Sequence, residues 1–186
     1  MKTEMEKCLA GEWYDCHNQV FLDLKTRTHK LLMKYNSLPY EDKEEKHSLL
    51  KKMLGSIGMK VSVASPFICD YGCNIHIGDN VMIGPNVTLA TPMHPLLPEE
   101  RNIRKRQDGS FYNLEYAKPI TIKDNCWLAS NVVVCGGVTI GEGCVIGAGS
   151  VVTKDIPPYS LAVGNPCRVI RKITEKDHMP DGIEKN

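Results

Sequence analysis

Aliphatic side chains recur at every sixth position over much of this chain. In the longer stretch the positions are Ile122, Leu128, Val134, Ile140, Ile146 and Val152. An earlier stretch carries the same period through Ile77, Ile83 and Leu89. A second series follows four residues after each aliphatic, as at Cys126, Val132, Val138 and Cys144. A period of six fits neither an α-helix, with about 3.6 residues per turn, nor a half-buried strand, with a period of about two.

This spacing predicts a solenoid in which each hexapeptide supplies a short strand, with one aliphatic side chain directed to the axis, and then a corner. Asn, Asp and Gly recur at the corners, in GDN, GPN, KDN and GEG, and they tolerate the left-handed backbone of a tight corner. Three hexapeptides close one turn, so residues 122–157 supply two turns and residues 77–94 about one more. A sandwich of short strands, the alternative, does not explain so strict a spacing. We predict a mainly β fold, a parallel β-helix of hexapeptide repeats.

The segment before the repeats, residues 1–58, is predicted to be helical. One apolar stripe with a period near 3.6 consists of Val20, Leu24, Leu31 and Tyr35. A second consists of Leu49, Leu50, Met53, Leu54 and Ile57. Gly11 and the Leu38-Pro39 step indicate breaks between helices. We expect the stripes to pack against the first coils.

Residues 59–170 form the predicted β-helix domain, which a long loop at residues 90–119 interrupts, and residues 171–186 form a tail. The loop is polar, charged and rich in proline. Since a loop of this length inside a regular solenoid is usually functional, we expect it to contribute to a site. A tolerated surface insertion is the alternative.

The charges nearly cancel, with 23 Lys and Arg against 22 Asp and Glu, so no global field favours nucleic acid or an anionic membrane. No apolar run of about 18 residues or more is present to span a bilayer, and MKTEMEKCLAGEWYD lacks the apolar core of a signal peptide. We therefore expect a cytoplasmic protein. The 8 cysteines include no CxxC pair, which argues against a zinc ribbon and favours reduced thiols.

His94 is the histidine whose position most favours catalysis. It lies between Met93 and Pro95, where the repeat gives way to the long loop, and Pro92 and Pro95 stiffen the backbone there. A histidine can accept a proton from a hydroxyl near pH 7, a role typically worth about 10²–10⁴ in rate. A zinc site would need several converging ligands, and no histidine occurs between Pro95 and Asp177, so we predict no metal.

A basic cluster follows the repeats. It consists of Arg168, Arg171 and Lys172, with Lys154 at the end of the coils. The planar guanidinium group suits phosphate, which favours a phosphate-binding role. Ordinary solubility explains such a cluster equally well.

Several motifs together carry a resemblance to a known family. They are AGEWYD, CDYGCNIHIG, GPNVTLATPMHPLLPEER, EYAKPITI and VIGAGSVVTKDIPPYSLAVGNPCRVIRKI, and they cover nearly the whole chain. The chain resembles the maltose and galactoside O-acetyltransferases of the hexapeptide-repeat acyltransferase superfamily. The resemblance implies a left-handed parallel β-helix, a homotrimer with active sites between subunits, acetyl-CoA as acetyl donor, and a sugar-like small-molecule acceptor.

The resemblance also implies roles for individual residues. His94 in MHPL matches the family's catalytic histidine, and Asp15 and Asp70 match acceptor-pocket positions, with Glu115 close to that pocket. The positions that match the lining of the coenzyme A site are Trp127, Ser130, Ala148, Thr153, Lys154, Arg168 and Arg171.

One departure from the family pattern concerns the acceptor side. Members of the family carry a further coil between the IHIG and DNVMIGPN motifs, which here run together, so about one turn of residues is absent. The donor side is intact. A non-catalytic coenzyme A-binding trimer that lost its acceptor pocket, and an acetyltransferase for a non-sugar acceptor such as an antibiotic or amine, are therefore alternatives to the sugar O-acetyltransferase.

Overall fold

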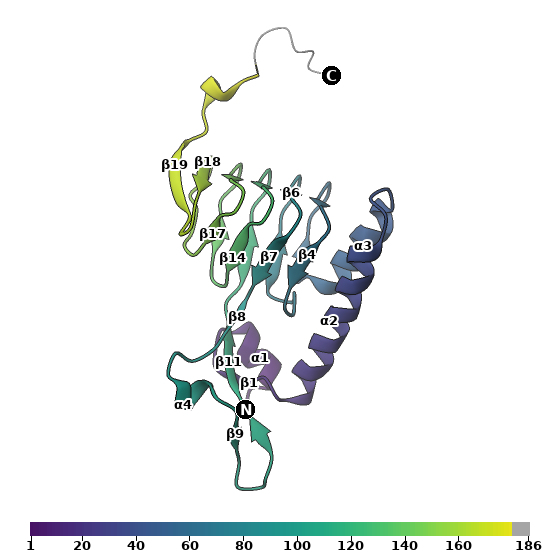
Figure 1. Cartoon of the computed structure of the whole chain (residues 1–186), viewed down its shortest axis with the longest axis vertical. Coiled ribbons are helices and arrows are strands. Elements are labelled where there is room, and N and C mark those ends of the chain that lie inside the picture. The colour runs from purple at the N-terminus through teal and green to yellow at the C-terminus, as the bar shows by residue number, and fades with distance from the viewer. Residues whose placement is uncertain (180–186) are drawn as a thin grey trace.

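The computed structural model describes residues 1–179, and most of its strands stack into a column of coils (Figure 1). Each of four complete coils contributes one strand to each of three parallel sheets. The coils comprise, in order, β2 (Ser56–Ile57), β3 (Ser62–Val63) and β4 (Phe67–Cys69); β5 (Ile75–Ile77), β6 (Met82–Ile83) and β7 (Val87–Ala90); β12 (Ile120–Ile122), β13 (Trp127–Leu128) and β14 (Val133–Cys135); and β15 (Thr139–Ile140), β16 (Val145–Ile146) and β17 (Val151–Val152).

The register of the parallel sheets confirms the repeat. Leu128 lies between Ile83 of the coil before it and Ile146 of the coil after it, and all three side chains are buried. Burial of each such side chain contributes about 1.5–3 kcal/mol to folding. The corners fit as predicted, because Asn80 and Asn125 adopt left-handed φ values of 55° and 60°.

The first coil was not predicted. Ile57, Val63 and Cys69 continue the period of six, but a longer corner separates Cys69 from Ile77 and breaks the count. Cysteine at the third position also hides the aliphatic pattern. The assignment of Ile57 to a helical stripe was therefore wrong, since α3 (Lys43–Met53) ends before it and Ile57 lies in strand β2.

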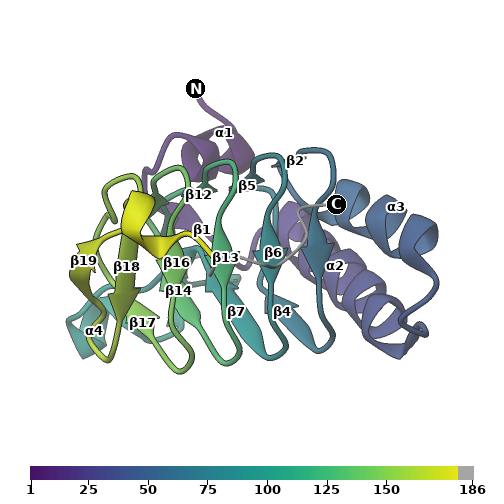
Figure 2. The ribbon, with the colours of Figure 1, turned by 90° about the horizontal axis from the view of Figure 1, so that it is seen from above.

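Helices cover the open end of the first coil (Figure 2). A capping box at Thr3 begins α1 (Glu4–Leu9), and the Asn18 side chain caps α2 (Gln19–Ser37). The Tyr35 hydroxyl donates to the Val63 carbonyl at 2.6 Å, which fixes α2 on the coil. The predicted stripe of α2 is displaced at its start, because Val20 is 39% exposed and the neighbouring Phe21 is buried.

The predicted loop at 90–119 has secondary structure of its own. It contains β8 (Pro92–Met93), α4 (Pro98–Arg101), the hairpin of β9 (Arg104–Lys105) and β10 (Phe111–Tyr112), and β11 (Leu114–Ala117). Strand β11 pairs antiparallel with β8 and with β1 (Tyr14–Asp15), so the segment joins the N-terminal region to the coils. We call residues 90–119 the excursion.

The coils continue beyond residue 157. Strand β18 (Ser160–Val163) pairs in parallel with β16, and β19 (Arg168–Lys172) folds back antiparallel on β18. Arg168 and Arg171 therefore lie on a strand that crosses the predicted domain boundary at residue 170. A short helix, η1 (Glu175–Asp177), follows. In residues 1–179, none of the helices combines the length and the apolar character needed to cross a bilayer.

Candidate active site

His94 follows strand β8 at the start of the excursion, and its ring is partly open to solvent, with 42% of the side chain exposed. Its Nδ1 lies 3.1 Å from the carbonyl oxygen of Leu114, and its Nε2 lies 3.4 Å from Oε1 of Glu115. Because a carbonyl oxygen can only accept a hydrogen bond, this contact assigns the proton to Nδ1. Nε2 then presents its lone pair, which is the form that a general base requires.

Glu115 is a buried carboxylate that three segments of the chain surround. Its Oε2 accepts hydrogen bonds from the hydroxyls of Tyr14 and Tyr71, both at 2.9 Å, and its Oε1 faces His94. Burial, followed by the charge of Glu115, raises the pKa of both tyrosines, which therefore remain protonated donors. The N-terminal strand, the first coil and the excursion thus meet at one carboxylate.

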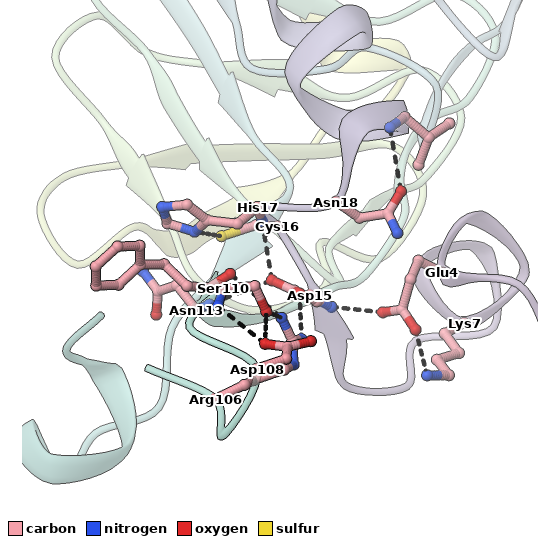
Figure 3. Close-up of polar contacts among 12 residues, drawn as sticks. Glu4, Lys7, Asp15, Cys16, His17, Asn18, Arg106, Asp108, Ser110 and Asn113 are labelled. Carbon is pink, nitrogen blue, oxygen red and sulfur yellow. Dashed lines mark hydrogen bonds and ion pairs between the residues drawn. The ribbon is translucent and has the colours of Figure 1, made fainter. Parts of the chain in front are cut away.

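Asp15 follows Tyr14 on strand β1, and Figure 3 shows its polar contacts. Its carboxylate accepts from the Arg106 guanidinium and from the backbone N–H groups of His17 and Asn113, at 3.0 and 3.2 Å for the last two. Burial raises the pKa of Asp15, but the hydrogen bonds from Arg106 and the two amides outweigh burial and hold it below its usual range. Asp15 is therefore ionised, and it borders a cavity of about 460 Å³ lined also by Trp13 and Tyr112.

Asp70 borders a second, smaller cavity of about 190 Å³, which Glu115 and Tyr71 also line. Helix α2 contributes Lys25 and His29 to its wall. Partial withdrawal from water, followed by the negative charge of Glu115, raises the pKa of Asp70, and Lys25 opposes this only in part. Two of the predicted acceptor-side carboxylates therefore differ: Asp15 is paired with Arg106, whereas burial and the charge of Glu115 disfavour the charged form of Asp70.

The residues predicted for the coenzyme A site lie along other parts of the coils. Trp127 is 47% exposed on β13, beside Met82 of the preceding coil. Ser130 and Ala148 lie at successive corners, where the amide of Gly149 donates to the Ser130 carbonyl at 3.0 Å. Thr153 and Lys154 follow β17 and are exposed, as are Arg168 and Arg171 on β19. Arg171 is already engaged, by a bidentate pair with Asp177 at 2.7 and 2.8 Å.

Sequence reasoning missed several residues that complete the site. Tyr14 and Tyr71 stand within the AGEWYD and CDYG motifs, but only the fold brings both hydroxyls to Glu115. Arg106 gave no signal beyond its charge. Within residues 1–179, no group of three or more His, Cys, Asp or Glu side chains has the arrangement of a metal site.

Two sequence-family models match the chain. The maltose acetyltransferase hexapeptide capping motif matches residues 7–58, and the bacterial transferase hexapeptide of six repeats matches residues 119–154. The galactoside O-acetyltransferase of Escherichia coli strain K12 is 38% identical over 192 aligned positions, which cover 92% of this chain and 90% of that protein. The chain belongs to the maltose and galactoside O-acetyltransferase family.

Solved structures agree with this assignment. A maltose O-acetyltransferase from Clostridium difficile 630 has a TM-score of 0.76 at 38% identity, with 94% of this chain and 99% of that chain covered. A galactoside acetyltransferase in complex with coenzyme A has a TM-score of 0.74 at 36% identity, with 97% and 98% covered. The resemblance drawn from sequence motifs is confirmed, and the chain is an acetyltransferase of the hexapeptide-repeat class.

The alignment with the family also bears on the absent coil. The alignment with the Escherichia coli enzyme has 192 positions and includes 92% of this chain's 186 residues, which is about 171 residues. About 21 aligned positions therefore have no residue from this chain. One coil here spans 20 residues between Ser62 and Met82 and 18 between Trp127 and Val145. The number of unmatched positions is therefore close to the length of one coil, and only the motifs place the gap between IHIG and DNVMIGPN.

The pKa shifts of Asp70 and Asp15 predict opposite effects on stability. A carboxyl whose pKa is raised by folding binds its proton more tightly when folded, so the unfolding free energy falls as pH rises from about 4 through that pKa. We expect Asp70→Asn to raise the melting temperature at pH 7 by about 2 °C or less, since solvent screens this accessible group, and the gain should vanish near pH 3.

Asp15→Asn is the matched comparison, with its melting temperature measured by calorimetry over the same range of pH as that of Asp70→Asn. The pKa of Asp15 is depressed by folding, so its ionised form stabilises the protein above about pH 4, and the stabilisation is lost as pH falls through the folded-state value. This variant should melt lower than wild type at pH 7. A lower melting temperature for Asp70→Asn at pH 7 would contradict the account of Asp70.

Proposed function

We propose that the protein transfers the acetyl group of acetyl-CoA to a hydroxyl of a sugar or glycoside by direct attack, with His94 as general base. The observation that carries the proposal is the geometry of His94: Nδ1 donates to the Leu114 carbonyl, which leaves the lone pair of the neutral ring on Nε2, and Nε2 lies 3.4 Å from Oε1 of Glu115. Membership of the family makes acetyl transfer the reaction, and a family member crystallised with coenzyme A supports acetyl-CoA as donor.

In the proposed reaction, Nε2 of His94 removes the proton of the acceptor hydroxyl while its oxygen attacks the thioester carbonyl carbon. A tetrahedral intermediate forms, and a donor near Ser130 stabilises its oxyanion, an interaction worth about 10²–10³ in rate. The carbon–sulfur bond then breaks, and the imidazolium returns its proton to the departing thiolate. The products are the acetyl ester and free coenzyme A, and no acyl-enzyme is required because the thioester is already activated.

Glu115 supports this cycle through its charge. The imidazolium that forms in the reaction carries a positive charge 3.4 Å from Oε1 of Glu115, at a site where the carboxylate is buried and therefore weakly screened. Tyr14 and Tyr71 hold Oε2, so the carboxylate keeps its orientation as the charge on His94 changes. Asp15 and Asp70 are proposed to bind hydroxyls of the acceptor.

The donor side of the proposal uses the residues along the coils. Trp127 offers an exposed aromatic face to the coenzyme, and the corners at Ser130, which is half-buried, and Ala148, which is exposed, are proposed to accept its pantetheine arm. Thr153, Lys154, Arg168 and Arg171 are proposed to bind its phosphates, which requires Arg171 to exchange its pair with Asp177 for a phosphate. No metal is required for any of these steps.

We further infer that the coil is left-handed and that the active protein is a homotrimer, in which this donor surface faces His94 of a neighbouring subunit. Both inferences rest on family membership, as does the cytoplasmic location. The absent coil favours a second candidate, a coenzyme A-binding trimer without an acceptor, or an enzyme for an antibiotic or amine acceptor. The excursion and helix α2 supply the polar groups, Arg106 and Lys25, that border the acceptor cavities in this chain.

Thiol release from acetyl-CoA tests the proposed function. We expect galactosides, maltose or glucose to stimulate release, and His94→Ala to lower the rate by about 10²–10⁴ because the general base is lost. His76→Ala is the control, since His76 is a half-buried histidine on a coil face. Release that depends only on amine acceptors would favour the second candidate, and coenzyme A binding without any release would remove the catalytic assignment.

Glu115→Gln tests the electrostatic role of the buried carboxylate. We expect kcat to fall about tenfold or more, because the imidazolium loses its counter-charge, while the KM for acetyl-CoA stays near its wild-type value. Glu142→Gln is a matched control, because Glu142 also accepts from a tyrosine, Tyr159 at 3.0 Å, on the exposed surface. Equal losses in both variants, or a change confined to KM, would contradict this role.

A further inference from the structure

A third cavity, of about 180 Å³, lies at the capped end of the coils, between the start of α3, the end of α2 and strand β3. Figure 1 shows this end of α3 far from the excursion that carries His94. Four basic side chains, Lys43, Lys46, His47 and Lys60, line the cavity together with Tyr35 and Tyr40. No carboxylate is among the residues that line it. The proposed acetyl transfer leaves this cavity unexplained.

Lys46 is the most informative of these residues, because its side chain is buried with 9% exposure. Its ammonium donates to Ser65 Oγ at 3.0 Å and lies 5.2 Å from the centroid of the Tyr35 ring. Neither partner carries a negative charge, and no ion pair involves Lys46 within the described part of the chain. A buried ammonium without a counter-charge is costly, so an anion in the cavity would supply what the fold leaves out.

Lys60 gives an independent indication that positive charge is favoured at this cavity. Its φ of 54° is left-handed, and the register places it level with Asn80 and Asn125 at the same corner of the next two coils, at 55° and 60°. Asparagine suits this backbone, whereas a lysine has no conformational advantage there. The corner geometry therefore does not explain why a lysine occupies this position, where it lines the same cavity as Lys46. Lys43 completes the group, with its ammonium 5.5 Å from the ring centroid of Tyr40.

We propose that this cavity binds a phosphoryl group, either as inorganic phosphate or on a small phosphorylated metabolite. Lysine ammonium groups bind phosphate as compact charges, and three lysines line this cavity with no carboxylate among its lining residues. The volume is below the range of about 300–1,000 Å³ typical of drug-sized ligands, so the cavity suits the phosphoryl group rather than a whole nucleotide. Glu45, the acidic residue of α3 nearest in sequence to Lys46, is paired with Lys34 instead.

Titration calorimetry with the full chain, at constant ionic strength, tests the proposal with inorganic phosphate and with a hexose phosphate in separate arms. Wild type should bind at least one of them saturably. Lys46→Met and Lys60→Asn should each weaken binding by about tenfold or more, because each removes one charge from the phosphate. Lys60→Asn places at this corner the residue that the neighbouring coils already use, so it should preserve the fold. A binding preference for the hexose phosphate would identify a metabolite as the source of the phosphoryl group.

Lys51→Met is the matched control, since Lys51 lies exposed on the same helix and does not line the cavity. It should bind phosphate as wild type does. Absence of saturable binding in wild type would overturn the proposal, and so would an equal loss in Lys51→Met, which would indicate a general charge effect. Coenzyme A affinity should be unchanged in Lys46→Met; a parallel loss would assign the cavity to the coenzyme instead.

Discussion

Each coil stacks on the next because the inward side chain of every hexapeptide lies directly above its equivalent in the neighbouring coil. Parallel hydrogen bonds hold this register, with Leu128 between Ile83 and Ile146 as one example. The stack of coils has two open ends and one interruption, and other parts of the chain occupy all three places. Helices α2 and α3 cover the first edge, β19 folds over the last strand at the other end, and the excursion leaves between the second and third coils (Figure 2). The location of the candidate site follows from that interruption.

The excursion supplies two polar side chains of the candidate site, His94 and Glu115, which the regular coils lack. By pairing with both β8 and β1, strand β11 places Glu115 where Tyr14, Tyr71 and His94 can reach it. A buried carboxylate with two tyrosine donors is a costly arrangement that stability alone does not require. Its position 3.4 Å from His94, whose other nitrogen donates to a carbonyl, supports the proposed role of the carboxylate as a counter-charge to the imidazolium.

The sequence predicted those features that depend on local geometry. A corner needs a left-handed residue and an axis needs an aliphatic, so the period, the corners at Asn80 and Asn125, and the place of His94 at the end of a coil could be read directly. The first coil escaped because Cys69 replaces an aliphatic and the following corner is longer. The pairing of β1 with β11 joins residues about a hundred positions apart through only two paired positions, and a pairing that short leaves no pattern in the sequence. The sequence also could not predict that Lys46 is buried without a carboxylate partner, because that environment arises only from the packing of α3 on the coil.

A crystal structure of the protein with bound coenzyme A is the most direct test of the claim that His94 and the coil surface form one active site. We expect coenzyme A between two copies of the chain, with Trp127 and Ser130 of one copy along its pantetheine arm. Its sulfur should then lie beside Nε2 of His94 from the other copy. Coenzyme A bound to a single copy, or with its sulfur remote from every His94, would show that His94 and the coil surface do not form one active site.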